Sequence, residues 1–207
     1  MAVLTAHEVT LAELRDRFHI QRSTDPQFFS EWLAPQPVLT SAETVAIDRI
    51  QQNYLSQLEV QSLNEETVKM VVVSPLLDVA GFYRSPYTID SEVSVELQEV
   101  DESGVALIGR IDTLILRQSQ IWILVVESKR TRFSVQAAIP QAIAYLLAKP
   151  EVDKPGYALL TNGGEFVFIK LQGKTSPVYD FSATFSLLNR GNDLSHVLGM
   201  LKQIDQK

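Results

Sequence analysis

The chemistry of this chain centres on three charged residues, Asp112, Glu127 and Lys129, which lie in a segment rich in isoleucine, leucine and valine. Fourteen residues separate Asp112 from Glu127, a spacing that a β-hairpin can fold back so that two carboxylates meet at the ends of adjacent strands. Glu127 and Lys129 are two positions apart, which places both on one face of a strand. Carboxylates that end apolar strands are costly to desolvate unless a cation compensates them. Two carboxylates and a backbone carbonyl suit Mg²⁺, and a lysine beside them can orient an attacking water, so the pattern predicts a metal-dependent hydrolytic site.

A plainer interpretation of the same residues needs no metal. In it, Asp112 and Lys129 form an ordinary cross-strand ion pair, and Glu127 is solvated where its strand ends. The bare pattern also arises by chance, since residues 205–207 (Asp-Gln-Lys) match it in a polar tail. Spacing alone leaves both interpretations open, and the two adjacent apolar strands favour the metal site.

Three consecutive strands are predicted to position these residues. Segments 105–117 and 121–128 are apolar and β-branched and are joined by a short polar stretch, which is typical of a β-hairpin. Residues 89–97 alternate between apolar and polar or acidic side chains, as in a strand with one solvated face. A helix over 134–148 follows, in which Pro140 is a weak point or a fresh start.

Helices are predicted before this meander. Thr5 and Glu8 have the spacing of a capping box, which predicts a helix over 5–18. Thr40 and Glu43 repeat that spacing at the start of a second helix.

A third helix begins after Asn64, a typical N-cap, and ends at Gly81 with a kink or restart at Pro75. After the crossover helix, a strand pair with a Gly163-Gly164 turn is predicted, and 180–207 is expected to form short helical stretches. The order predicts a mixed α/β fold, with an antiparallel meander, a crossover helix and further strands, flanked by helices.

Composition limits the class of protein. The chain has 207 residues, 45% of them hydrophobic, and it contains no cysteine, which excludes thiolate metal sites and a cysteine nucleophile. The three histidines are not at ligand spacing. A net charge of −7 argues against tight DNA binding, although segment 127–136 is locally basic. The N-terminus lacks the features of a signal peptide and the longest apolar run is short, so we expect a cytoplasmic protein.

An ordered set of motifs resembles a known family. The segments GRIDTLIL, IWILVVESK, a helix with PQAIAY, and a strand ending in LLTNGGEF are similar to the PD-(D/E)XK nuclease superfamily. More specifically, they resemble the N-terminal nuclease domain of type I restriction enzyme R subunits and related stand-alone proteins. The resemblance implies a restriction-endonuclease-like core at 61–172, between an N-terminal helical region (1–60) and a C-terminal helical extension (173–207) in a single domain (1–207).

The resemblance also assigns roles to residues. It implies that Asp112 and Glu127 are metal carboxylates, that the Ser128 carbonyl is a further ligand, and that Lys129 polarises the attacking water. The implied cofactor is Mg²⁺ or Mn²⁺.

Members of the family usually add a glutamate from a preceding helix. Glu66 is the first choice here, Glu65 the second and Glu43 a distant third. A glutamate on a helix is more commonly part of a solvated face or a partner of the helix dipole, so the structural interpretation stays open for all three.

Further residues are implied by the same resemblance. Gln141 and Tyr145 match a Gln-x-x-x-Tyr motif one helical turn apart; we interpret Gln141 as functional and Tyr145 as mainly structural, with DNA contact as its alternative. Thr161, Asn162 and Gly163 are also explained by turn chemistry. Three arginines are candidate phosphate contacts, although exposed arginines are more often simply solvated: Arg110, Arg130 and Arg132.

The chain departs from the R subunits in one respect. It contains no G-x-x-x-x-G-K-[ST] sequence, because Gly173-Lys174-Thr175 is preceded by Phe168 where a glycine is required. ATP-driven translocation is therefore excluded.

The expected function is Mg²⁺-dependent hydrolysis of DNA phosphodiester bonds, with RNA as a further possible substrate and a homodimer as a geometric possibility. The alternative is a catalytically inactive nuclease-fold module that binds nucleic acid or protein.

Overall fold

A computed structural model describes the chain over residues 3–5, 9–98, 106–117, 121–127, 134–148, 154–173 and 175–205. The backbone alone is described for 3–5, 91–98, 106–117, 121–127 and 205.

The elements that precede the meander are β1 (Val3–Thr5), α1 (Leu11–Phe18), β2 (Gln21–Arg22), α2 (Ser30–Leu33), α3 (Ser41–Val60), α4 (Glu65–Val68), the π-helical segment η1 (Lys69–Val73) and α5 (Ser74–Val79). The remaining elements are β3 (Tyr87–Gln98), β4 (Ala106–Arg117), β5 (Ile121–Glu127), the 3₁₀ turn η2 (Val135–Ala138), α6 (Ile139–Leu147), β6 (Gly156–Thr161), β7 (Glu165–Gln172), β8 (Val178–Phe181), β9 (Phe185–Ser186) and α7 (Leu194–Asp205).

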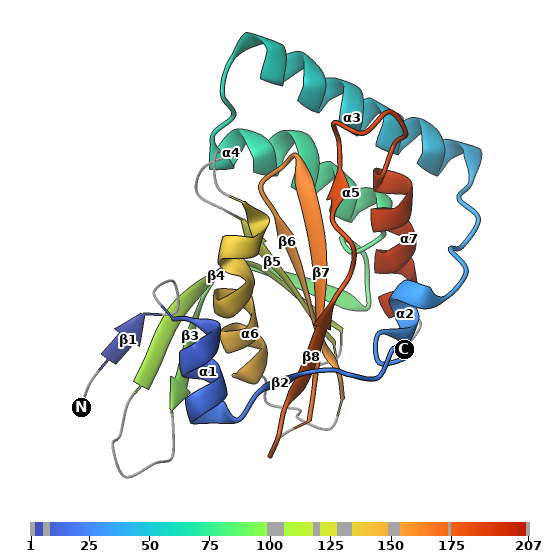
Figure 1. The fold of residues 1–207 in the computed structure, drawn as a ribbon. Coiled ribbons are helices and arrows are strands. Elements are labelled where there is room, and N and C mark those ends of the chain that lie inside the picture. The colour runs from blue at the N-terminus through green and yellow to red at the C-terminus, as the bar shows by residue number, and fades with distance from the viewer. Residues whose placement is uncertain are drawn as a thin grey trace.

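The described strands form one mixed sheet in the order β1-β4-β5-β6-β7-β8-β2, in which β3 also pairs with β4 and β9 with β7. Strands β3, β4 and β5 are successively antiparallel, as the sequence predicts. Helix α6 then carries the chain to β6, which runs parallel to β5. The molecule is therefore a mixed α/β fold, with a mixed sheet flanked by helices (Figure 1).

Both faces of the central strands are covered, and alternate residues of β6 divide between two cores. Tyr157 and Leu159 join the core formed with α3, η1, α5 and α7. Ala158 and Leu160 join the core formed with α1 and α6. All six residues of β6 are buried, which explains a sequence run with no polar alternation before Thr161.

The helix that precedes the meander begins as predicted. The Asn64 side chain accepts a hydrogen bond from the backbone N–H of Thr67, and Gly81 ends the segment with a φ of +88°. Pro75 falls in the first turn of α5, where its missing N–H is accommodated after the π-helical segment. Pro140 likewise lies in the first turn of α6, so this proline marks a fresh helix start.

The first helix begins later than predicted. Val3–Thr5 is a strand parallel to β4, and α1 starts at Leu11 with Thr10 as its N-cap. The capping box is formed by Thr10 and Glu13: the Thr10 hydroxyl accepts from the Glu13 backbone N–H, and the Glu13 carboxylate accepts from the Thr10 backbone N–H. The prediction of a Thr5–Glu8 capping box was therefore wrong for Thr5, which lies in a strand.

The C-terminal part is also less helical than predicted. Segment 173–207 contributes β8 and β9, both paired with β7, before the single long helix α7. Region 1–60 likewise contains the short strands β1 and β2 as well as helices. Strands of two to four residues are too short to show a periodic pattern in their own sequence, so the sequence did not predict them.

Candidate functional site

Asp112 and Glu127 lie where β4 and β5 part. The described register between these strands runs from the Arg117–Ile121 pair to the Thr113–Val125 pair. Asp112 is the next residue of β4, and Glu127 is two residues further along β5. Beyond this point β4 pairs with β1 instead, through residues 106–108. The backbone thus places residues 112 and 127 at neighbouring strand positions at one end of the shared register.

Glu127 also marks the end of the parallel pairing with β6, where it is the register partner of Thr161. Strands pair at about 4.8 Å, so the turn that follows Thr161 is adjacent to the end of β5. Helix α4 and the turn between β6 and β7 lie together at this end of the sheet (Figure 1).

The Thr161–Gly164 turn is held by its own side chains. The Thr161 hydroxyl accepts from the Gly163 backbone N–H at 2.9 Å. The Asn162 side-chain oxygen Oδ1 accepts from the backbone N–H groups of Gly164 and Glu165 at 3.0 and 2.8 Å. Turn chemistry therefore accounts for Thr161 and Asn162, as the plainer interpretation of these residues predicts.

Glycine in this turn allows α4 to approach closely. Gly163 has a φ of +87°, and a Cβ there would lie 2.7 Å from both methyl carbons of Val68. A Cβ on Gly164 would lie 2.4 Å from the Tyr54 hydroxyl of α3. The turn is thus packed against α4 and α3, which fixes α4 beside the ends of β5 and β6.

The position of α4 distinguishes between the two predicted glutamates. Val68 is 2% exposed, and Glu65 lies one turn before it on the same face of the helix. The Glu65 side chain is 24% exposed and that of Glu66 is 78% exposed. Glu65, the second choice from sequence, therefore lies on the side of α4 that meets the sheet, while Glu66 faces solvent.

Both carboxylates are within reach of a lysine. The Lys69 ammonium donates to Glu65 at 3.1 Å and to Glu66 at 3.5 Å. Sequence reasoning did not single out Lys69, although its i+4 spacing from Glu65 is a signal that could have found it.

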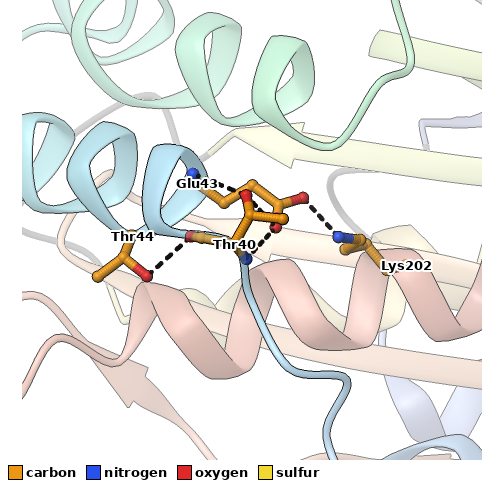
Figure 2. A network of polar contacts seen from close by, with 4 residues as sticks. All are labelled: Thr40, Glu43, Thr44 and Lys202. Carbon is orange, nitrogen blue, oxygen red and sulfur yellow. Dashed lines mark hydrogen bonds and ion pairs between the residues drawn. The ribbon is translucent and has the colours of Figure 1, made fainter.

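Glu43 is occupied elsewhere. Its carboxylate accepts from the backbone N–H and hydroxyl of Thr40 and is ion-paired with Lys202 of α7 (Figure 2). The hydrogen bond from Lys202, followed by that from the Thr40 backbone, lowers the pKa of Glu43. From Glu43 to the end of α3 the helix extends about 26 Å. Glu43 caps α3 at the end remote from α4, where its carboxylate is engaged by Thr40 and Lys202.

Gln141 and Tyr145, one helical turn apart on α6, contact each other. The Gln141 side-chain amide donates to the Tyr145 hydroxyl at 2.9 Å. Tyr145 is 1% exposed within the core between α6 and the sheet, whereas Gln141 is half-buried. The structural interpretation of Tyr145 agrees with this burial, and Gln141 is the more accessible of the two.

A second polar cluster was not predicted from the sequence. The Lys170 ammonium of β7 donates to both carboxylate oxygens of Glu31, at 3.1 and 2.9 Å, and to the Phe28 carbonyl at 2.9 Å. The Tyr157 hydroxyl donates to the same carboxylate at 2.8 Å. Glu31 and Lys170 are 4% and 6% exposed. The available signal was a lysine within the buried apolar strand β7.

Burial and charge shift the pKa values within this cluster. Burial would raise the pKa of Glu31, but the hydrogen bond from Lys170 and further donors outweigh it, and the pKa is lowered. Burial raises the pKa of Tyr157, and the neighbouring Glu31 charge raises it further. The cluster is an internally satisfied ion pair that fastens α2 to the sheet.

Several predicted residues are not placed in full. Ser128, Lys129, Arg130 and Arg132 lie outside the described residues, and the side chains of Asp112, Glu127 and Arg110 also lie outside them. Among the side chains that the structure does describe, no group of three histidine, aspartate or glutamate residues could hold a metal ion.

No helix in the described ranges combines the length and apolar character needed to cross a membrane. A scan of protein-family models and a search of curated proteins find no match to this chain.

Proposed function

We propose that this protein is a metal-dependent nuclease of the restriction-endonuclease type that hydrolyses DNA phosphodiester bonds with Mg²⁺ or Mn²⁺. The observation that carries the proposal is the strand arrangement around Asp112 and Glu127. Three antiparallel strands, a crossover helix and a strand parallel to β5 follow one another, and both residues lie where β4 and β5 part. This arrangement agrees with the core that the sequence resemblance implies.

The donor set fits a hard cation. Asp112, Glu127 and Glu65 supply carboxylate oxygens, which Mg²⁺ and Mn²⁺ prefer over nitrogen or sulfur ligands. Glu65 replaces Glu66 in this proposal because its helix face is turned towards the ends of β5 and β6. A divalent cation bound there would supply the positive charge that phosphodiester hydrolysis requires.

The remaining roles belong to the residues that the resemblance assigns. Lys129, two positions after Glu127, orients the attacking water, and the Ser128 carbonyl completes the ligand set. Gln141, which donates a hydrogen bond to Tyr145, contacts the substrate in this proposal. In this proposal, Arg110, Arg130 and Arg132 contact substrate phosphates. Because the net charge of the protein is −7, DNA binding requires a local strip of basic residues.

A second candidate function rests on that net charge. An acidic protein binds a polyanion weakly, so a nuclease-fold module that binds another protein without catalysis is favoured by the −7 balance. It requires neither a metal nor accessible phosphate contacts.

Incubation of the purified chain with supercoiled plasmid DNA tests the proposal. We expect nicking or linearisation with Mg²⁺ or Mn²⁺ and none with EDTA, since the carboxylates alone cannot stabilise the developing charge. Single-stranded RNA, assayed in parallel, determines whether the substrate is DNA or RNA. Calorimetric titration with Mn²⁺ measures metal binding independently of cleavage.

Matched variants connect the activity to the site. Asp112→Asn and Lys129→Ala should abolish cleavage with unchanged circular dichroism, whereas Asp78→Asn, on the exposed side of α5, should cleave as the wild type does. Equal cleavage by wild type and both site variants would overturn the assignment. Absence of Asp112-dependent Mn²⁺ binding would favour the non-catalytic module.

A further inference from the structure

Lys69 lies at the junction of α4 and the π-helical segment η1, with its ammonium between two carboxylates. Its distance to the nearer oxygen is 3.1 Å for Glu65 and 3.5 Å for Glu66. Lys69 and Glu65 are similarly sheltered, at 25% and 24% exposure. Of these two carboxylates, Glu65 is the nearer and the more sheltered.

This ion pair lies on the side of α4 that packs against the turn beside the end of β5. Lys69 and Glu65 share the side of the helix that also carries Val68, since residues three and four apart are neighbours on a helix surface. Val68 contacts Gly163, whose turn begins at Thr161, the register partner of Glu127. One continuous set of contacts thus links the ion pair to the end of β5.

A cation that binds Glu65 must compete with this ammonium. The Lys69 ammonium neutralises the Glu65 carboxylate directly, and a divalent cation bound to the same oxygen atoms would repel that ammonium. Lysine carries its charge on a flexible four-carbon stem, so the ammonium can move to a new partner without any backbone change. Glu66 is an alternative partner at 3.5 Å, and in a nuclease site a substrate phosphate is a further group of opposite charge that the ammonium can contact.

We propose that Lys69 is a second cationic residue of the nuclease site, which neutralises Glu65 in the metal-free protein and contacts a substrate phosphate once a metal occupies that carboxylate. The inference rests on the proposed nuclease function and deepens it. It makes Lys69 an antagonist of metal binding and an aid to DNA binding.

An ordinary helix ion pair would behave differently. A Glu–Lys pair at i,i+4 contributes a little helix stability and has no effect on ligands. Only the proposed role moves metal affinity and DNA affinity in opposite directions when the lysine charge is removed.

The test compares Lys69→Met, Lys69→Arg and the wild type by calorimetric titration with Mn²⁺ and by the anisotropy of a fluorescent DNA duplex in Ca²⁺. We expect Lys69→Met to bind Mn²⁺ about two- to fivefold more tightly, the range of a partly exposed ion pair. The same variant should bind DNA more weakly, and the slope of log K against log salt should fall by about 0.9, as for one lost phosphate contact. Lys69→Arg keeps the charge and should remain close to the wild type in both measurements.

Lys202→Met provides the matched control. Lys202 pairs with Glu43 at similar exposure, 30% and 18%, but at the far end of α3. We expect it to leave both affinities unchanged, which shows that loss of one ammonium anywhere on the protein is not sufficient.

The outcomes separate this inference from the function on which it rests. If the wild type binds Mn²⁺ in a way that Asp112→Asn removes, but Lys69→Met changes neither the Mn²⁺ affinity nor the salt slope, then Lys69 is only a helix ion pair and the inference is overturned. If Mn²⁺ binding does not depend on Asp112, the proposed function fails first and the inference with it.

Discussion

Lys170→Met removes a buried ammonium from the Glu31 carboxylate and leaves a side chain of similar length in its place. In the wild type that ammonium lies 2.9 and 3.1 Å from the two carboxylate oxygens, with side-chain exposures of 7% for Lys170 and 3% for Glu31. After the substitution, Glu31 retains the hydrogen bond from the Tyr157 hydroxyl. One hydroxyl cannot replace a full counter-charge at a site that water does not reach.

The expected loss is large. Removing one partner of a buried ion pair costs about 3–5 kcal/mol, because the remaining charge stays buried without compensation. That is a substantial part of the roughly 5–15 kcal/mol that stabilises a typical domain. For a chain of this size it corresponds to a fall in Tm of about 6–20 °C.

Urea unfolding at pH 7, followed by far-ultraviolet circular dichroism, measures this loss. The midpoint should fall with an unchanged m value, since the surface exposed on unfolding is the same. Lys202→Met, which breaks the partly exposed pair with Glu43, should cost about 1 kcal/mol or less. The triple variant Lys170→Met, Glu31→Leu, Tyr157→Phe removes all three polar groups and should recover most of the stability.

The reasoning is refuted by a small single effect. If Lys170→Met costs no more than Lys202→Met, water reaches the Glu31 carboxylate in solution and screens it. If the triple variant is as unstable as the single one, the loss came from packing around the lysine stem and not from the unpaired charge.

Two further predictions follow from the described contacts. Gly163→Ala should lower the free energy of unfolding by about 2–4 kcal/mol, because a positive φ is strained for alanine and its Cβ meets Val68. Gly81→Ala is the control, since it has the same backbone strain but no atom within 4 Å of its Cβ. Equal losses of stability in urea unfolding would refute the contact with α4. Burial raises the pKa of Tyr157 above its ordinary value of 10.0, so the hydroxyl loses its proton at lower pH in the unfolded state than in the folded state. The contribution of Tyr157 to the free energy of unfolding should therefore decline as pH rises above 10. In urea unfolding, the stability of Tyr157→Phe should fall by about 1 kcal/mol less than that of the wild type between pH 10 and 11, and parallel curves would refute the shift.

Strong local patterns made the centre of the fold predictable. Alternation over 89–97 specifies β3, because each residue there reports which face it lies on, and the β-branched apolar runs after it indicate β4 and β5. Asn64 and Thr40 identify helix starts because the hydrogen bonds of an N-cap are made within four residues. The backbone positions of Asp112 and Glu127 follow from those strands.

Features that depend on distant residues were not predictable in this way. Thr5–Glu8 and Thr10–Glu13 have the same spacing, and what distinguishes them is that Val3–Thr5 pairs with Ala106 and its neighbours, far along the chain. The sequence interpretation ranks Glu66 before Glu65, whereas the packing of α4 against Gly163 leaves Glu65 sheltered and Glu66 exposed. Glu31 and Lys170 are 139 positions apart, so no local pattern connects them.

The positions of β1 and β2 in the sheet have a consequence for the order in which this protein folds. β1 pairs with residues 106–108, and β2 pairs with Val178 and Tyr179, while Arg22 is ion-paired with Asp180 across 158 positions. A ribosome therefore releases these strands long before it makes the partners that the structure gives them. Contacts of such long sequence separation form late and slow the overall rate. Although they are synthesised before their partners, β1 and β2 are accordingly among the last strands to reach their native places, and the central strands must form without them.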